Sequence, residues 1–349
     1  MMQKQFTKNF SFSAKGLAIL LLLMYHLFEN EALISSMNVI YQPFSLSAFL
    51  TLTGFGNVCV SIFVFLTAFG IAKGLLSMES MTPALAYKQA VKRFVILMAH
   101  FVVLYLSINL LWWVKFDYQS LYGLNKQGFL YIITDATGLS MFFDTPTLNA
   151  TWWYMEIAYL LIFLVPLLVW LTKKIGYPIL LLAAFTPHII TFNYDVTRYL
   201  FVAVFGICAA YGKWTDKMLN LKIHLVFQWI IGIVGFVLCV LIRQNYVVYE
   251  TYIHLIDAPI ALFLIYLATL IGSIPLLGKA LAFLGKHSFN IYLVHTFFYM
   301  ALWQKYVYYF RYSWVTLLVL LISCLIYSIL LEFFKKVTGF KKLLARYHG

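Results

Sequence analysis

Long, uninterrupted apolar runs are the feature that most limits what this chain can fold into. In a run such as residues 313–334, apolar side chains follow one another without the alternation of a half-buried strand. Charged residues make up only 11% of the chain, against about 25% in soluble domains. Lipid must therefore be the main solvent, and continuous apolar runs in lipid form helices that satisfy their own backbone groups. The sequence predicts an all-α polytopic membrane protein.

About ten segments are predicted to span the membrane, because a spanning helix needs about 20 apolar residues. The fifth and sixth are short, and they form either two spans or one re-entrant pair. The chain is predicted to be a single transmembrane domain over residues 1–349. The ten segments are residues 12–33, 56–77, 92–114, 150–172, 177–193, 198–212, 223–242, 252–272, 284–304 and 313–334.

The distribution of basic residues predicts how the chain is oriented, because Lys and Arg concentrate in cytoplasmic loops. Ten spans that start inside leave only six of the 25 basic residues outside, and they place both termini in the cytoplasm. The basic flank of the first run predicts a retained first helix rather than a cleaved signal peptide. The six outer basic residues are Lys115, Lys126, Arg198, Arg243, Lys305 and Arg311.

The formal charge of +13 does not indicate nucleic-acid binding, because the basic residues are spread over short loops. The four cysteines (Cys59, Cys208, Cys239 and Cys324) lie inside apolar runs without metal-ligand spacing. They are predicted to be small buried hydrophobes, and no metal site is predicted.

Six of the nine tryptophans are predicted to form an outer aromatic belt, with stacking on sugar rings as a second interpretation. These six are Trp112, Trp113, Trp152, Trp153, Trp303 and Trp314.

Ionisable residues inside apolar runs are costly in lipid and are therefore functional candidates. In the first run, Lys15 and His26 are eleven positions apart, close to three helical turns, so they share a face about 16 Å apart along the axis. Lys15 is expected at the inner interface and His26 past the middle of the bilayer. A neutral imidazole is a good general base. The alternative is a hydrogen-bonded core histidine with Lys15 as an ordinary interface anchor.

Two later segments add further candidates. Glu156 lies one to two turns into the fourth segment from the outside, at a depth where it can partner His26; the alternative is a structural carboxylate. In the ninth segment, Ser288, Tyr292 and His295 share one helical face by their spacing, and this polar stripe is expected to face protein or a cavity. His100 is expected to be a packing histidine.

Basic residues also crowd the inner surface around Lys15. The positive-inside bias alone predicts most of them. A second interpretation is a phosphate-binding rim, because Lys and Arg are the usual partners of phosphate groups. The residues concerned are Lys73, Lys88, Lys92, Arg93 and Lys286.

Five motifs in chain order resemble those of the type 3 membrane acyltransferases, bacterial O-acyltransferases that modify cell-surface glycans. The resemblance extends over nearly the whole chain. It opens with the family's basic residue, ten residues and histidine, and it closes with the family's Gly, Ser, Tyr and His on one segment. The motifs are matched by Lys15 and His26; by residues 60–69; by Lys92 and Arg93; by Trp153, Glu156 and Tyr159; and by Gly285, Ser288, Tyr292 and His295.

The chain departs from the family pattern in two motifs. The usual Ser-Gly of the second motif is replaced by Thr67 and Ala68, and the usual Arg-x-x-Pro does not follow Arg93. Some relatives carry a C-terminal esterase-like domain, whereas only a short basic tail follows Phe334. The chain therefore resembles the stand-alone members.

The resemblance implies transfer of an acyl group, acetyl by default, from cytoplasmic acyl-CoA to a hydroxyl of an extracytoplasmic glycan or glycolipid, in the bacterial plasma membrane. It implies that His26 acts as general base or transient acyl carrier, that Glu156 orients the imidazole, and that Tyr292 or His295 supports the oxyanion. The cofactor phosphates would rest on the inner basic residues, which are Lys15, Arg93, Lys92, Lys73 and Lys286.

Two other functions are compatible with intramembrane His and Glu residues. A transporter or flippase for a polysaccharide or glycolipid would also line its path with such groups, although no half-to-half match of broken helices is present. A non-catalytic membrane scaffold would leave the set of Lys15, His26, Glu156 and His295 without a role. Binding or hydrolysis of acetyl-CoA separates an acyltransferase from both.

Overall fold

The computed structural model describes residues 5–78, 82–123, 125–189 and 194–348. Within these ranges the regular secondary structure is helical, apart from one isolated bridge between Ile40 and Tyr312. The predicted all-α class is confirmed. Seven helices of the described part are long and apolar enough to cross a membrane. The count of ten stays a prediction, since residues 190–193 of the fifth predicted segment lie outside the described residues. The seven are Lys8–Phe28, Leu46–Leu76, Pro83–Lys115, Ala150–Ile175, Leu225–Gln244, Tyr252–Gly272 and Ser313–Val337.

The first half of the chain includes one short helix directly after α1, and two helices between the third and fourth predicted segments. Its helices are α1 (Lys8–Phe28), α2 (Glu31–Ser36), α3 (Leu46–Phe55), η1 (Gly56–Val58), α4 (Cys59–Leu76), α5 (Pro83–Trp112), η2 (Trp113–Lys115), α6 (Tyr118–Tyr122), α7 (Lys126–Ala136), η3 (Ala150–Trp152) and α8 (Trp153–Ile175).

The second half contains the helix with the predicted polar stripe, α14, which continues into a π-helical segment. Its elements are α9 (Ile179–Ile189), α10 (Tyr194–Tyr211), α11 (Trp214–Leu219), α12 (Leu225–Gln244), α13 (Tyr246–Gly272), α14 (Pro275–Thr296), the π-helix η4 (Phe297–Leu302), α15 (Gln304–Val307), α16 (Ser313–Val337) and α17 (Phe340–His348).

Two helices begin about nine residues before their predicted segments, and proline explains both. Helix α5 starts at Pro83, where the Thr82 side chain caps the helix by accepting a hydrogen bond from the Leu85 N–H. Helix α14 starts at Pro275. Proline fits the first helical position because its fixed φ suits a helix and its missing N–H would have no partner there. Hydropathy alone misses these starts because Lys88 in α5 and Lys279 in α14 interrupt the apolar run after the first turn.

Helices α1 and α14 form the central pair of the fold. A methyl group at Gly16 would collide with the carbonyl of Leu281, and one at Gly285 would collide with the carbonyl of Phe12. The two glycines therefore allow the two backbones to touch. The same pair meets again near the other end, where the rings of His26 and His295 lie side by side, so α1 and α14 run in the same direction. We call the Lys15 end of this pair inner and the His26 end outer, following the predicted orientation.

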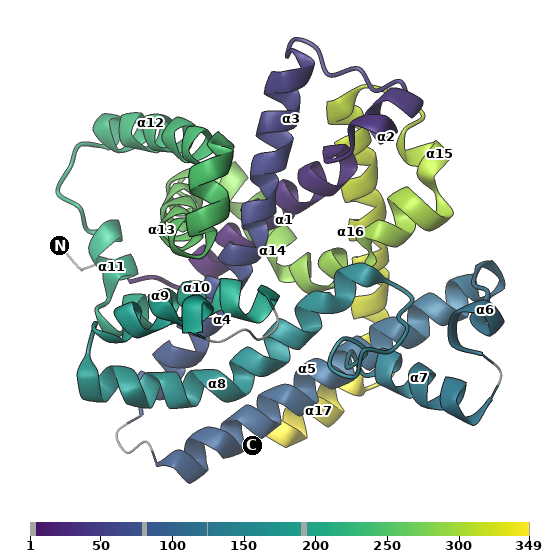
Figure 1. Cartoon of the computed structure of the whole chain (residues 1–349), viewed down its shortest axis with the longest axis horizontal. Helices are drawn as coiled ribbons and strands as arrows, with labels where there is room; N and C mark the ends of the chain where they lie inside the picture. The colour runs from purple at the N-terminus through teal and green to yellow at the C-terminus, as the bar shows by residue number, and fades with distance from the viewer. Residues whose placement is uncertain (1–4, 79–81, 124, 190–193, 349) are drawn as a thin grey trace.

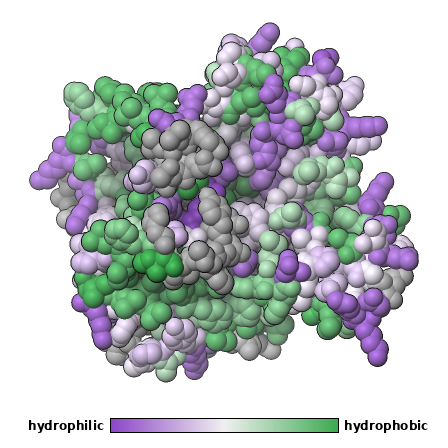
Figure 2. All heavy atoms as spheres, viewed as in Figure 1, coloured by the Kyte–Doolittle hydropathy of each residue, from purple (hydrophilic) through white to green (hydrophobic). Residues whose placement is uncertain are grey.

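The remaining helices surround this pair. Helix α4 packs against α1, α8 and α10, while α12 and α13 lie on one flank and α5 with α17 on another (Figure 1). Apolar side chains cover α12 and α8 in the view of Figure 2, whereas hydrophilic ones gather around α2, α15 and α6. All four cysteines are buried and unpaired, as predicted for small hydrophobes. This arrangement gives α1 and α14 protein neighbours, so polar groups on them are shielded from lipid.

Candidate active site

An inner cavity of about 220 Å³ opens between α1, α4, α5, α8 and α14. Lys15 lines it, as do Ser288 and Tyr292 of the predicted stripe. The prediction that this stripe faces a cavity is confirmed for these two residues. The rest of the wall is mainly apolar and includes Phe63, Leu97, Met155, Ala158, Ile162, Phe289 and Leu293. The cavity thus joins one cation to a long apolar lining, which suits an amphiphilic ligand.

Three aromatic side chains form the end of the cavity that faces the histidines, and we call them the aromatic layer: Phe63, Tyr154 and Tyr292. The Tyr292 ring centroid lies 5.1 Å from that of Tyr154 and 5.9 Å from that of Phe63. On its other side Tyr292 lies 6.1 Å from the ring of His295. Neither His26 nor His295 lines the cavity. The aromatic layer therefore separates the cavity from the histidine pair.

His26 lies in the last turn of α1, closer to the outer end than predicted. The helix ends at Phe28 because Asn30 starts α2, its side chain accepting a hydrogen bond from the Leu33 N–H. The His26 side chain is 19% exposed, and its Nδ1 lies 3.2 Å from Oε1 of Glu29. With Nδ1–H donating to the carboxylate, Nε2 carries the lone pair of the neutral ring. This is the arrangement of a general base oriented by a carboxylate.

Glu29 is held by more than one group. The Tyr25 hydroxyl also hydrogen-bonds its carboxylate. Burial alone would raise the pKa of Glu29, but the hydrogen bond and charge of His26 and the hydrogen bond of Tyr25 bring that pKa below its usual value. The carboxylate is therefore ionised near neutral pH and available as a hydrogen-bond acceptor for His26.

His295 is fully buried in the last α-helical turn of α14. Its Nδ1 lies 2.6 Å from the carbonyl oxygen of Tyr292 and must carry the proton of that hydrogen bond. Within the described part of the chain its Nε2 has no hydrogen-bond partner. The His295 ring centroid lies 4.9 Å from that of His26. In its neutral form, His295 thus offers a hydrogen-bond acceptor next to His26 and not a donor.

Glu29 is a carboxylate in contact with His26, and the predicted role of Glu156 beside His26 stays a prediction. Glu156 is buried in the first turn of α8, but it does not line the inner cavity. On α8 it is the neighbouring positions, Tyr154, Met155 and Ala158, that face the cavity.

The predicted phosphate-binding residues do not all lie together. Lys73 donates to the carbonyl of Phe6 at 2.9 Å and so ties down the start of the chain. Lys286 lies on a separate groove with Lys279, over the ring of Phe12. Arg93 and Lys92 are half-buried on α5, and the Arg93 guanidinium lies beside Gly74. Of the five residues, Lys15 lines the inner cavity.

Sequence reasoning missed Glu29, although a signal for it exists. Glu29 follows His26 by three positions, a spacing that brings side chains together at a helix end. It also missed the helix-end contacts that fix this turn, in which Tyr308 donates to the Leu27 carbonyl at 2.8 Å and Thr53 donates to the Phe28 carbonyl at 3.4 Å. These partners are distant in sequence, so only the folded structure reveals them.

Comparison with known proteins identifies the family. Residues 13–333 match the family model described as an acyltransferase domain. The match covers most of the chain, so the protein belongs to the type 3 acyltransferase family and is a multi-pass membrane acyltransferase. No curated protein and no solved structure matches the chain.

Proposed function

We propose that this protein transfers an acyl group, acetyl by default, from cytoplasmic acyl-CoA to a hydroxyl of an extracytoplasmic glycan or glycolipid, across the plasma membrane of a bacterium. The observation that carries the proposal is the His26–Glu29 pair, which has the geometry of an oriented general base. It lies at one end of α1, while Lys15, which lines the inner cavity, lies toward the other. One helix thereby connects a donor end and an acceptor end.

The inner cavity suits the donor. Lys15 is placed to meet a phosphate of the cofactor, and the apolar wall beyond it suits the pantetheine arm. Along α1, Lys15 and His26 are about 16 Å apart, a distance that an extended arm must cover to bring a thioester to His26. The aromatic layer lies on this path, so its rings must move aside as the arm enters.

The chemistry has two possible routes from the same pair. In the direct route, Nε2 of His26 takes the proton of the acceptor hydroxyl as its oxygen attacks the thioester carbonyl. The C–O bond forms, the C–S bond breaks, and the proton passes to the departing thiolate. In the second route, Nε2 itself attacks the thioester carbonyl, the C–S bond breaks, and CoA leaves as the thiolate. The acceptor oxygen then attacks the acyl group on the ring, the N–C bond breaks, and the hydroxyl proton passes to the freed Nε2 and from there to the thiolate. Glu29 stabilises the charged imidazole in both.

The oxyanion that forms at the thioester carbon needs a hydrogen-bond donor. Neutral His295 cannot supply one, because its single N–H is committed to the Tyr292 carbonyl. The Tyr292 hydroxyl is the better candidate, since this side chain borders both the cavity and His295. His295 then serves as a neutral neighbour that shapes the surroundings of His26.

Purified protein in proteoliposomes with radiolabelled acetyl-CoA tests the proposal. We expect binding of the cofactor and slow transfer of label to water or to added glycan, both saturable. A polysaccharide transporter would bind and consume no acetyl-CoA, so absence of both would reject the acyltransferase mechanism. Mass spectrometry and NMR of surface glycans from cells with and without the gene would then identify the acceptor by its missing acyl group.

A further inference from the structure

The carbonyl of Leu293, two positions before His295, receives hydrogen bonds from outside its helix. The indole N–H of Trp152 donates to it at 2.9 Å, and the side-chain amide of Asn149 at 3.5 Å. The same Asn149 amide donates to the hydroxyl of Thr296 at 2.6 Å. Both donors come from the segment that leads into α8, and the two acceptors flank His295 on either side. We call these contacts the Leu293 clamp.

The clamp holds the place where α14 changes its winding. After Thr296 the chain continues as a π-helix over Phe297–Leu302, and the Trp303 N–H donates to the Phe298 carbonyl five positions earlier. Such π segments are rare and often occur at functional sites. A change from α to π winding alters the direction of every following side chain, so donors fixed outside the helix are needed to hold its register there.

His295 depends on this backbone for its position. Its Nδ1–H is bonded to the Tyr292 carbonyl in its own helix, and in the described structure its Nε2 has no hydrogen-bond partner. Ring contacts with His26, Tyr292 and Tyr299 complete its surroundings. A shift of the backbone around Leu293 would therefore carry the imidazole of His295 with it and change its approach to His26.

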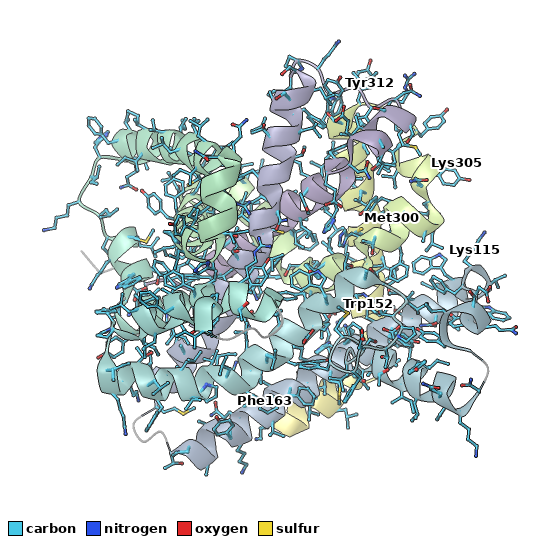
Figure 3. All side chains as sticks on the ribbon, in the orientation of Figure 1. Lys115, Trp152, Phe163, Met300, Lys305 and Tyr312 are labelled. Carbon is cyan, nitrogen blue, oxygen red and sulfur yellow. The ribbon has the colours of Figure 1, made fainter. Side chains whose placement is uncertain are left out.

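The donors themselves are rigidly placed. Trp152 is buried, and its ring lies 5.0 Å from Phe101 and 5.8 Å from Phe297, near the middle of the molecule (Figure 3). The side-chain oxygen Oδ1 of Asn149 accepts from both the N–H and the hydroxyl of Thr151, so the side-chain NH2 of Asn149 points toward α14. The neighbours of Trp152 and Asn149 therefore hold both donors in the positions from which they reach the Leu293 carbonyl and the Thr296 hydroxyl.

We propose that Asn149 and Trp152 are positioning residues for the acyl-transfer reaction, which set the orientation of His295 against His26 through the Leu293 carbonyl. The proposal rests on the proposed function for its catalytic consequence. Its structural consequence, the placement of His295, does not depend on turnover.

The kinetic test is Trp152→Phe, which removes the indole N–H and keeps most of the ring. Trp314→Phe is the matched control, since Trp314 is largely exposed on α16. We expect the turnover rate of Trp152→Phe to fall about fivefold to thirtyfold, as for a buried carbonyl that loses a donor. The KM for acetyl-CoA should stay within about twofold, because the Trp152 side chain does not itself line the inner cavity. A normal rate in Trp152→Phe would overturn the proposal.

The structural test is ¹⁵N NMR of histidine-labelled protein, in which the His295 signals are those that vanish in His295→Gln. Trp152→Phe should shift them and Trp314→Phe should not. A slower Trp152→Phe whose His295 signals do not move would also overturn the proposal, since the lower turnover rate would then not come from a displaced His295.

If Trp152→Phe fails to fold, Thr296→Val takes its place, because it removes one acceptor of Asn149 at constant size. Wild-type protein without acetyl-CoA turnover would reject the proposed function, while the NMR shifts would still decide the placement of His295.

Discussion

The two ends of the α1–α14 pair differ in almost every physical respect. At the inner end, one lysine borders an apolar cavity of about 220 Å³. At the outer end, two imidazoles lie 4.9 Å apart, and a partly exposed carboxylate holds one of them. In the proposed function, the inner end holds the long amphiphilic donor and the outer end moves the proton.

Under the proposed function, this difference allows one site to serve two compartments. The aromatic layer of Phe63, Tyr154 and Tyr292 lies between the two ends. In the proposed function, acyl-CoA binds on one side of this layer, and proton transfer at His26 takes place on the other. Substitutions at the two ends should therefore have separable effects. Outer-end changes should act on the rate of transfer, and inner-end changes on the concentration of acyl-CoA that is needed.

The largest effect is expected for His26→Ala. Loss of the general base should lower transfer by about 10²–10⁴-fold while acetyl-CoA still binds in the inner cavity. Transfer is measured with radiolabelled acetyl-CoA, and binding by equilibrium dialysis of the same preparation. His100→Ala is the control, because His100 packs against Phe340 away from both ends. Near-normal transfer by His26→Ala would remove His26 from the mechanism.

Glu29→Gln should give the next largest effect. The amide keeps the shape but loses the charge that orients and stabilises the imidazole, and hydrogen bonds to charged groups contribute about 1.5–3 kcal/mol, or about 10–150-fold in rate. The KM for acetyl-CoA should not change. Glu31→Gln, on the exposed first turn of α2, is the control and should transfer normally. An equal loss in both variants would mean that negative charge on the outer surface, rather than contact with His26, matters.

Lys15→Ala should change the KM for acetyl-CoA more than the rate of transfer. Removal of the cavity's cation should raise the KM for acetyl-CoA about tenfold, as for a lost charge-assisted contact to phosphate, with a smaller change in the maximal rate. Lys286→Ala is the matched control, since that lysine lies at the same end but on a separate groove. If Lys286→Ala raised the KM as much as Lys15→Ala, basic residues at the inner end would bind the cofactor together. Lys15 would then have no special role in the inner cavity.

The sequence predicts those features of the site that depend on the spacing of residues within a single helix. Helical periodicity predicts the stripe of Ser288 and Tyr292, and both residues line the inner cavity. It also predicts that Lys15 and His26 share a face of one helix, and both lie on α1. Trp152 was assigned to the aromatic belt, yet its N–H bonds the Leu293 carbonyl. That contact joins positions 141 apart in sequence. Periodicity within one helix carries no information about such a pair.

The choice between Glu29 and Glu156 shows the same limit. Depth in the membrane suggests Glu156 as a partner of His26, but depth carries no information about a contact made by a turn at a helix end. In the structure the chain leaves α1 after Phe28 and brings Glu29 onto the ring of His26. A hydropathy profile does not show where α1 ends, because the end depends on a local contact, the Asn30 cap of α2.

The smallest predicted effect concerns acid stability at the outer end. The pKa of Glu29 is lowered in the folded protein, so its charged form stabilises the fold. This contribution is complete above the ordinary glutamate pKa of about 4.3, and it is lost as the pH falls through the lowered value. The difference in thermal midpoint between wild type and Glu29→Gln should therefore be constant from about pH 5 to 6 and shrink below pH 4. Glu31→Gln should show no such trend. A difference that grows toward acid would mean that Glu29 is protonated in the folded state, and it would then be unable to orient His26 as proposed.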